Sequence, residues 1–166
     1  MFREMRRKKQ ELSWEDTIQV LERGTNGVLA VIGDEGYPYG VPLSYVYADG
    51  KIYFHCAPSG HKADAIRAND KVCFTVIDQD KIVAEELTSY FRSVIAFGRA
   101  VILEDPEEKL RAHIIFSEKY SAAFPEKIQS EIKKGLTHML MVRIDIEHLT
   151  GKEAIELVRE KMQPQG

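Results

Sequence analysis

Short β-branched, apolar runs separated by tight turns restrict the fold of this sequence more than any other feature. Asp34-Glu35-Gly36 marks one turn, and Asp49-Gly50 is a strong hairpin signal. Strands joined so closely pair antiparallel, because parallel strands need a long crossover. The pattern therefore predicts a mainly β, α+β fold built as an antiparallel barrel. Its strands are predicted at residues 27–32, 37–47, 51–56, 71–77, 90–103 and 138–146.

Helices are predicted to flank the strands. Ser13 with Asp16 three residues later resembles a capping box, and Gly24 ends the apolar pattern of a helix over residues 14–23. Pro106 is typical of the first turn of another helix. The long strand over 90–103 is expected to bulge at Gly98. Further helices are predicted at 61–68 and 106–120, and another helical stretch follows Pro125 and runs to residue 134. A terminal helix is predicted at 152–161, with Ile155 and Val158 pointing inward. Residues 78–88 are predicted to form a loop or lid.

Length and composition fit a single domain in 166 residues, with a net charge of −3. This charge gives no reason to expect nucleic acid or a membrane surface as a partner. A basic cluster within residues 1–12 is interpreted as a flexible arm, and residues 152–166 as a terminal helix and tail. No apolar run approaches about 18 residues, and no signal peptide follows the arm. We expect a cytoplasmic protein with Cys56 and Cys73 reduced.

The segment from Phe54 to Lys62 is the most informative about chemistry, because it leads a strand directly into a helix. Ser59 is predicted to cap that helix, and Gly60 would let a ligand approach the backbone. Lys62 adds a positive charge in the first turn, where it opposes the helix dipole. A phosphate there would relieve the conflict. The alternative, an ordinary capped helix with an exposed lysine, is equally compatible with the spacing.

Histidine spacing does not indicate a metal site. His55 and Cys56 are adjacent on a predicted strand, so their side chains point to opposite faces. The other histidines are scattered without the spacing of metal ligands. We therefore predict no metal, and we find no nucleophile elbow or catalytic carboxylate pair.

An ordered set of segments over about residues 5–152 carries a family resemblance. The chain resembles the pyridoxamine-phosphate-oxidase-like flavoproteins, and within them the nitroimidazole-resistance (Nim) type. The matching segments are Met5-Arg6-Arg7-Lys8, Tyr39-Gly40-Val41-Pro42-Leu43-Ser44-Tyr45, Gly50-Lys51-Ile52-Tyr53-Phe54-His55, Gly60-His61-Lys62, Val72-Cys73-Phe74, Arg92-Ser93-Val94-Ile95-Ala96-Phe97-Gly98-Arg99-Ala100, Val142-Arg143-Ile144-Asp145-Ile146 and Thr150-Gly151-Lys152.

The resemblance implies an antiparallel split β-barrel with flanking helices, dimerised with FMN at the interface. It implies that the strand with Val41, Pro42, Leu43 and Ser44 runs beside the flavin ring. It also implies that the segment leading from the strand at 51–56 into the helix at 61–68 holds the flavin phosphate, and that the strand carrying Ser93 lies close to that phosphate. The implied phosphate segment comprises His55, Cys56, Ala57, Ser59, His61 and Lys62.

The same resemblance implies an FMN-dependent oxidoreductase with a small-molecule substrate, and nitro-group reduction as one candidate activity. His55 is the candidate functional side chain near the ring. The chain departs from the vitamin oxidases, since it lacks their arginine-rich ending and has His61 where arginine is common. We therefore do not expect pyridoxamine phosphate oxidation. The alternative is a non-catalytic flavin- or haem-binding protein or sensor of the same fold.

Overall fold

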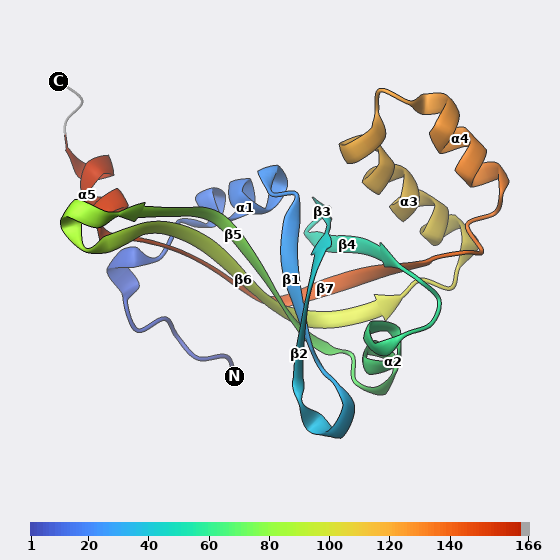
Figure 1. Cartoon of the computed structure of the whole chain (residues 1–166), viewed down its shortest axis with the longest axis horizontal. Helices are drawn as coiled ribbons and strands as arrows, with labels where there is room; N and C mark the ends of the chain where they lie inside the picture. The colour runs from blue at the N-terminus through green and yellow to red at the C-terminus, as the bar shows by residue number, and fades with distance from the viewer. Residues whose placement is uncertain (164–166) are drawn as a thin grey trace.

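The computed structural model describes residues 1–163 and contains one seven-stranded sheet (Figure 1). All neighbouring strands pair antiparallel, in the order β2-β1-β5-β6-β7-β4-β3. The α+β, antiparallel prediction is confirmed. The strands are β1 (Asn26–Ile32), β2 (Pro38–Ser44), β3 (Val46–Ala48), β4 (Lys51–Cys56), β5 (Lys71–Val83), β6 (Thr88–Ile102) and β7 (Leu140–Glu153).

Within the described residues 1–163, five α-helices flank the sheet. In α1, the Ser13 hydroxyl accepts a hydrogen bond from the Asp16 N–H at 3.0 Å, as the capping pattern predicts. The helices α3 and α4 form one hairpin beside β4 and β7 (Figure 1). None of the helices within residues 1–163 combines the length and apolarity needed to cross a membrane. The helices are α1 (Trp14–Arg23), α2 (His61–Ala68), α3 (Pro106–Ser121), α4 (Pro125–Lys133) and α5 (Ile155–Met162).

The two edge strands of the sheet, β2 and β3, are consecutive in the chain and separated only by Tyr45. The sheet must therefore curl until its edges approach each other. Tyr45 is fully buried at this corner, and its hydroxyl donates to the Leu21 carbonyl at 2.8 Å. The sequence predicted one strand over 37–47, but the corner at Tyr45 divides it in two. Within residues 1–163 no ladder joins β2 to β3, so barrel closure stays a prediction.

The main core lies inside the curl of the sheet, under α1 and α2. Its largest fully buried side chains include Phe54, Phe74 and Leu29, which come from three different strands. A smaller cluster around Phe116 and Met141 holds the α3–α4 hairpin against β4 and β7. The turn that leads from β4 into α2 is therefore anchored to the packed core at both ends.

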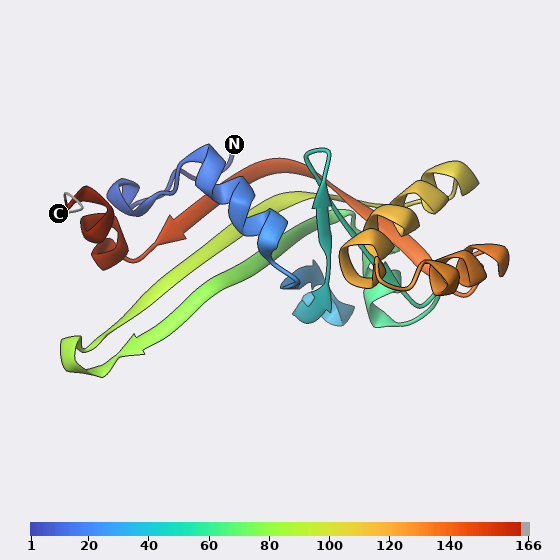
Figure 2. The ribbon, with the colours of Figure 1, turned by 90° about the horizontal axis from the view of Figure 1, so that it is seen from above.

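Residues 78–88 form the distal part of the β5–β6 hairpin, so the predicted loop or lid is wrong. Pairing continues past Gln79↔Arg92 to Val83↔Thr88, and the ribbon extends far from the core (Figure 2). A ribbon solvated on both faces needs no hydrophobic period, which explains why the strand pattern was absent. The register shifts between Phe97 and Gly98, as predicted for the bulge.

The C-terminal boundaries also differ from the predictions. β7 runs to Glu153 because it pairs with β6 as far as Arg92, whereas the sequence predicted its end at residue 146. The terminal helix consequently begins at Ile155, and Leu157 is its buried residue. Ile155 and Val158, predicted to point inward, are half-buried.

Candidate functional site

A cavity of about 240 Å³ lies where β4 turns into α2. Five residues predicted from the sequence to hold a phosphate line it together, and Tyr39 of β2 closes one side. The strand–turn–helix segment thus forms one concave site. The five are Cys56, Ala57, Ser59, His61 and Lys62.

The start of α2 carries no side-chain cap, so the prediction that Ser59 caps the helix is wrong. The N-cap residue is Gly60, whose φ of +118° is strained for any residue with a side chain. A Cβ at Gly60 would meet nothing within 4 Å, so the space in front of it is open. Because no side chain accepts from them, the first N–H groups of α2 remain available to a ligand.

Lys62 and His61 supply the nitrogen-bearing side chains of this cavity. Lys62 has no ion-pair or hydrogen-bond partner within residues 1–163. His61 stacks on Tyr39 with ring centres 4.2 Å apart, and its Nε2 accepts the Asp34 N–H at 3.2 Å. This bond leaves Nδ1 to carry the ring proton of the neutral form. Both residues can therefore donate to an anion.

His55 lies on the other side of β4 from this cavity, as the alternation of a strand requires. Its ring meets Phe116 of α3 edge-on, with ring centres 4.8 Å apart. Desolvation lowers the pKa of His55, and the Lys62 charge lowers it further. The structure thus separates His55 from Cys56 and its neighbours. Burial raises the pKa of the Cys56 thiol, which keeps it protonated at neutral pH.

The four β2 residues predicted to follow the flavin ring divide between two faces. Val41 and Leu43 pack against the core, whereas Pro42 and Ser44 are exposed on the outer face of the sheet. Ser93 of β6 pairs with Ile77 and Lys152 and is not part of the α2 cavity.

The outer face of the sheet exposes several apolar side chains. Cross-strand pairing places Val28, Thr75 and Ile95 in one row, beside Pro42 at one end and Thr150 at the other. Val28 is 37% exposed and Ile95 is also 37% exposed. The N-terminal arm approaches the neighbouring row, where Phe2 stacks on Phe97 and His148.

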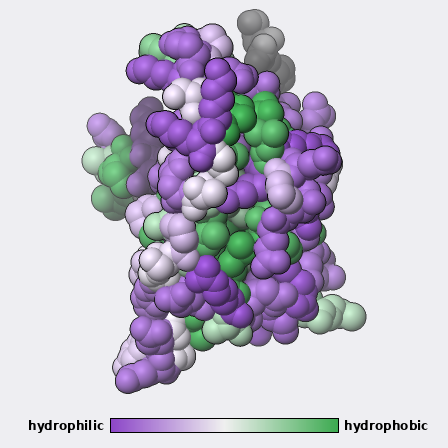
Figure 3. Space-filling view, turned by 90° about the vertical axis from the view of Figure 1, so that its right-hand side faces the viewer, coloured by the Kyte–Doolittle hydropathy of each residue, from purple (hydrophilic) through white to green (hydrophobic). Residues whose placement is uncertain are grey.

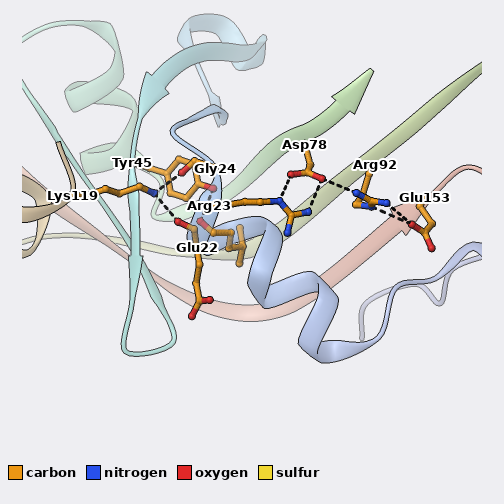
Figure 4. Close-up of polar contacts among 9 residues, drawn as sticks. Glu22, Arg23, Gly24, Tyr45, Asp78, Arg92, Lys119 and Glu153 are labelled. Carbon is orange, nitrogen blue, oxygen red and sulfur yellow. Dashed lines mark hydrogen bonds and ion pairs between the residues drawn. The ribbon is translucent and has the colours of Figure 1, made fainter. Parts of the chain in front are cut away.

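Figure 4 shows a chain of ion pairs that the sequence did not indicate. None of its residues lines the α2 cavity. The Asp78 carboxylate forms ion pairs with Arg23 at 2.6 Å and with Arg92 at 3.2 Å. Arg92 also forms an ion pair with Glu153 at 3.1 Å. The hydrogen bond from Arg23 holds the pKa of Asp78 below its usual range. Lys161 of α5 reaches Glu153 at 2.8 Å and completes the chain. These charges are all paired with one another, so they are not available to a ligand.

Residues 13–153 match the family model described as pyridoxamine 5'-phosphate oxidase. The chain belongs to this family. The resemblance inferred from the ordered segments is therefore confirmed at the level of the family. No curated protein sequence matches the chain significantly.

Several solved structures have a fold similar to that of this chain. A conserved hypothetical protein from Mycobacterium tuberculosis has a TM-score of 0.79 at 22% identity, covering 98% of this chain and 96% of that one. A proposed 5-nitroimidazole antibiotic resistance protein from Bacteroides thetaiotaomicron has a TM-score of 0.71 at 22% identity, covering 86% of each. An FAD-binding protein from Mesorhizobium loti has a TM-score of 0.62 at 26% identity, covering 87% and 97%.

Proposed function

We propose that this chain is an FMN-dependent oxidoreductase that holds the flavin phosphate at the start of α2. The observation that carries the proposal is the cavity with Lys62 unpaired beside an uncapped helix start. A helix start with free N–H groups and a neighbouring cation is suited to a phosphate. The family match and the FAD-binding relative support a flavin as the molecule that brings it.

The residues present fit the phosphate group. Its oxygens would accept from Lys62 Nζ, from His61 Nδ1 and from the first N–H groups of α2. The open space at Gly60 lets the phosphate approach the backbone, and Tyr39 keeps the His61 ring in place. A bound flavin supplies the hydride and electron chemistry, while the protein supplies binding and orientation. Pro42 and Ser44 are the β2 side chains free to contact the ring.

A homodimer is part of the proposal. The outer-face row in which Thr75 lies between the exposed Val28 and Ile95 offers a surface for a second copy, and exposed apolar side chains gathered in this way mark interaction sites. We expect dimers in light scattering, and monomers after Ile95→Asp. Ile82→Asp is the control, because Ile82 is an exposed isoleucine at the tip of the same hairpin. Monomers in the wild-type protein would contradict this part of the proposal.

The proposal excludes pyridoxamine phosphate as substrate. That substrate would bring a second phosphate, which normally requires arginine side chains. Arg143 is the arginine of the last strand, and it is already bound to Glu108 and Asp145. We expect no hydrogen peroxide from flavin-loaded protein given pyridoxine phosphate. A rate above about 1 per second would contradict this.

Nitro compounds are the first acceptors to test, because one structural relative is a proposed 5-nitroimidazole resistance protein. The experiment records the visible flavin absorption of the purified protein without oxygen, before and after NAD(P)H. We expect NAD(P)H to bleach the flavin and an added nitro compound to restore the colour. Bound flavin that NAD(P)H does not bleach would contradict the oxidoreductase and favour a non-catalytic flavin-binding protein.

A further inference from the structure

A basic cavity of about 550 Å³ lies between the N-terminal arm and α5. Six residues line it, and four of them are consecutive cations: Arg6, Arg7, Lys8, Lys9, Gln10 and Ile155. α5 and α2 lie toward opposite ends of the molecule (Figure 1), and the basic cavity shares no residue with the α2 cavity. Figure 3 views the end that carries α3 and α4, where apolar side chains appear between polar ones.

The segment that carries these cations is held to the fold. Lys8–Gln10 form one 3₁₀ turn, in which the Gln10 N–H donates to the Arg7 carbonyl at 2.9 Å. The Leu12 N–H donates to the Gly151 carbonyl at 3.0 Å, and the Leu12 side chain is buried in the main core. The cations are therefore presented from an anchored turn, which lowers the entropy lost when a ligand orders them.

Three of the four cations form no ion pair within the described residues 1–163. Lys8 Nζ lies 2.7 Å from the Glu4 carboxylate. Arg6, Arg7 and Lys9 take part in none of the ion pairs. Like charges gathered on one short segment repel each other. A ligand with several phosphates would remove this repulsion, because arginine and lysine both bind phosphate oxygens.

Gln10 adds a second requirement for the ligand. The residue is 4% exposed, and its Oε1 is a buried oxygen without a hydrogen-bond partner in residues 1–163. An unsatisfied buried acceptor is costly, so a ligand that donates an N–H or O–H to Gln10 gains affinity. A chain of phosphates offers acceptors. A nucleobase amino group or a ribose hydroxyl offers the missing donor.

We propose that this cavity binds a nucleoside polyphosphate. The phosphates bind Arg6, Arg7 and Lys9, and a donor group of the base or the ribose binds Gln10 Oε1. The volume agrees with this class, because sites for small molecules span about 300–1,000 Å³. The net charge of −3 disfavours a long nucleic acid as the occupant. The proposal does not depend on the flavin phosphate at α2, so the protein should hold FMN and the nucleotide at the same time.

ATP and inorganic tripolyphosphate test the proposal, because both carry a chain of three phosphates and only ATP has a base and a ribose. Each is titrated by calorimetry into the full-length protein, with and without FMN, at fixed ionic strength. We expect ATP to bind at least about fivefold more tightly than tripolyphosphate. Gln10→Met keeps the length of the side chain and removes its oxygen. It should lower the ATP affinity to that of tripolyphosphate and leave tripolyphosphate binding unchanged.

Neutralising the cations should weaken both probes. In the variant Arg6→Gln/Arg7→Gln/Lys9→Gln, ATP and tripolyphosphate should each bind at least about tenfold more weakly, from three exposed charge contacts together. The control removes the same number of charges at exposed lysines elsewhere and should bind both probes as the wild type does: Lys71→Gln/Lys81→Gln/Lys133→Gln.

Four results would overturn the proposal. They are no ATP binding up to about 5 mM, equal affinity for ATP and tripolyphosphate, displacement of ATP by FMN, and unchanged ATP affinity in folded Gln10→Met or in the triple arm variant. Should Gln10→Met not fold, the comparison of the two probes in the wild type decides alone. Absence of FMN binding would refute the proposed function and leave the ATP result unaffected, so the two failures are distinguishable.

Discussion

The charges at the start of α2 and those along the β5–β6 hairpin are arranged in opposite ways. Along the hairpin, Arg92 is shared by Asp78 and Glu153, and Glu153 is only 3% exposed (Figure 4). At α2, Lys62 has no partner within the described residues 1–163 and faces an open cavity. Removing one partner of an enclosed ion pair destabilises the fold, whereas a single charge beside free N–H groups is available to a ligand. The two regions should therefore respond to mutation through different observables.

The largest effect is expected on the paired side. Glu153→Ala leaves Arg92 and Lys161 with one carboxylate partner fewer at a buried position, and should lower the free energy of unfolding by about 3 kcal/mol. Denaturant titration measures the loss. Glu160→Ala, an exposed glutamate on α5, should change stability by less than about 0.5 kcal/mol. Equal losses in both variants would remove the distinction between the regions.

Lys62→Ala should leave stability intact and weaken FMN binding. A charged hydrogen bond contributes about 1.5–3 kcal/mol, so the FMN Kd should rise roughly 10- to 150-fold. Riboflavin lacks the phosphate and should bind both proteins alike. Lys71→Ala, at an exposed lysine beyond the far end of α2, serves as the control. If FMN and riboflavin weaken equally, the phosphate is not held by Lys62.

Acidification should lower the stability of the protein through His113 of α3, a buried histidine outside both regions. The pKa of His113 is lowered in the folded protein, so the unfolded chain binds its proton first as the pH falls. The contribution of the neutral His113 ring to folding stability is therefore present above the unfolded pKa of about 6.5 and is lost as the pH falls below that value. Thermal unfolding between pH 7 and pH 5 should show a smaller decline for His113→Gln than for wild type. Identical declines would mean that His113 does not contribute.

The smallest effect is expected at Ser59. Because Gly60 is the N-cap and no side chain bonds to the helix start, Ser59→Ala should change stability by less than about 0.5 kcal/mol. Ser13→Ala removes the hydrogen bond to the Asp16 N–H and should cost about 1 kcal/mol by the same thermal assay. A loss at Ser59 as large as that at Ser13 would restore the original capping interpretation.

Local patterns predicted the fold well where one face of an element is buried. The capping pair Ser13 and Asp16, the bulge at Gly98 and the strand leading into α2 all follow from neighbouring residues. The predictions were wrong for residues 78–88, the tip of the β5–β6 hairpin, and for β7 beyond residue 146, which pairs with β6. At the hairpin tip neither face is packed into the core, so the residues carry no alternating hydrophobic signal.

The candidate site was predictable only in its contiguous part. Six of the seven residues from Cys56 to Lys62 line one cavity because they follow one another around one turn; Pro58 is the exception. His113 joins His55 only through the packing of α3 on β4, and the sequence spacing of these histidines gave no such indication. The ion pair between Arg23 and Asp78 spans 55 residues and depends equally on tertiary structure. Charge alone could not distinguish paired residues from the unpaired Lys62.

Direct comparison of FMN and riboflavin binding to the wild-type protein tests the central claim most directly. Both share the same ring, so quenching of flavin fluorescence reports each Kd in the same assay, and only the phosphate differs. If the start of α2 holds the phosphate, FMN should bind at least about 10-fold more tightly than riboflavin, from one charged hydrogen bond alone. Equal affinity for the two, or no binding of either, would contradict the account.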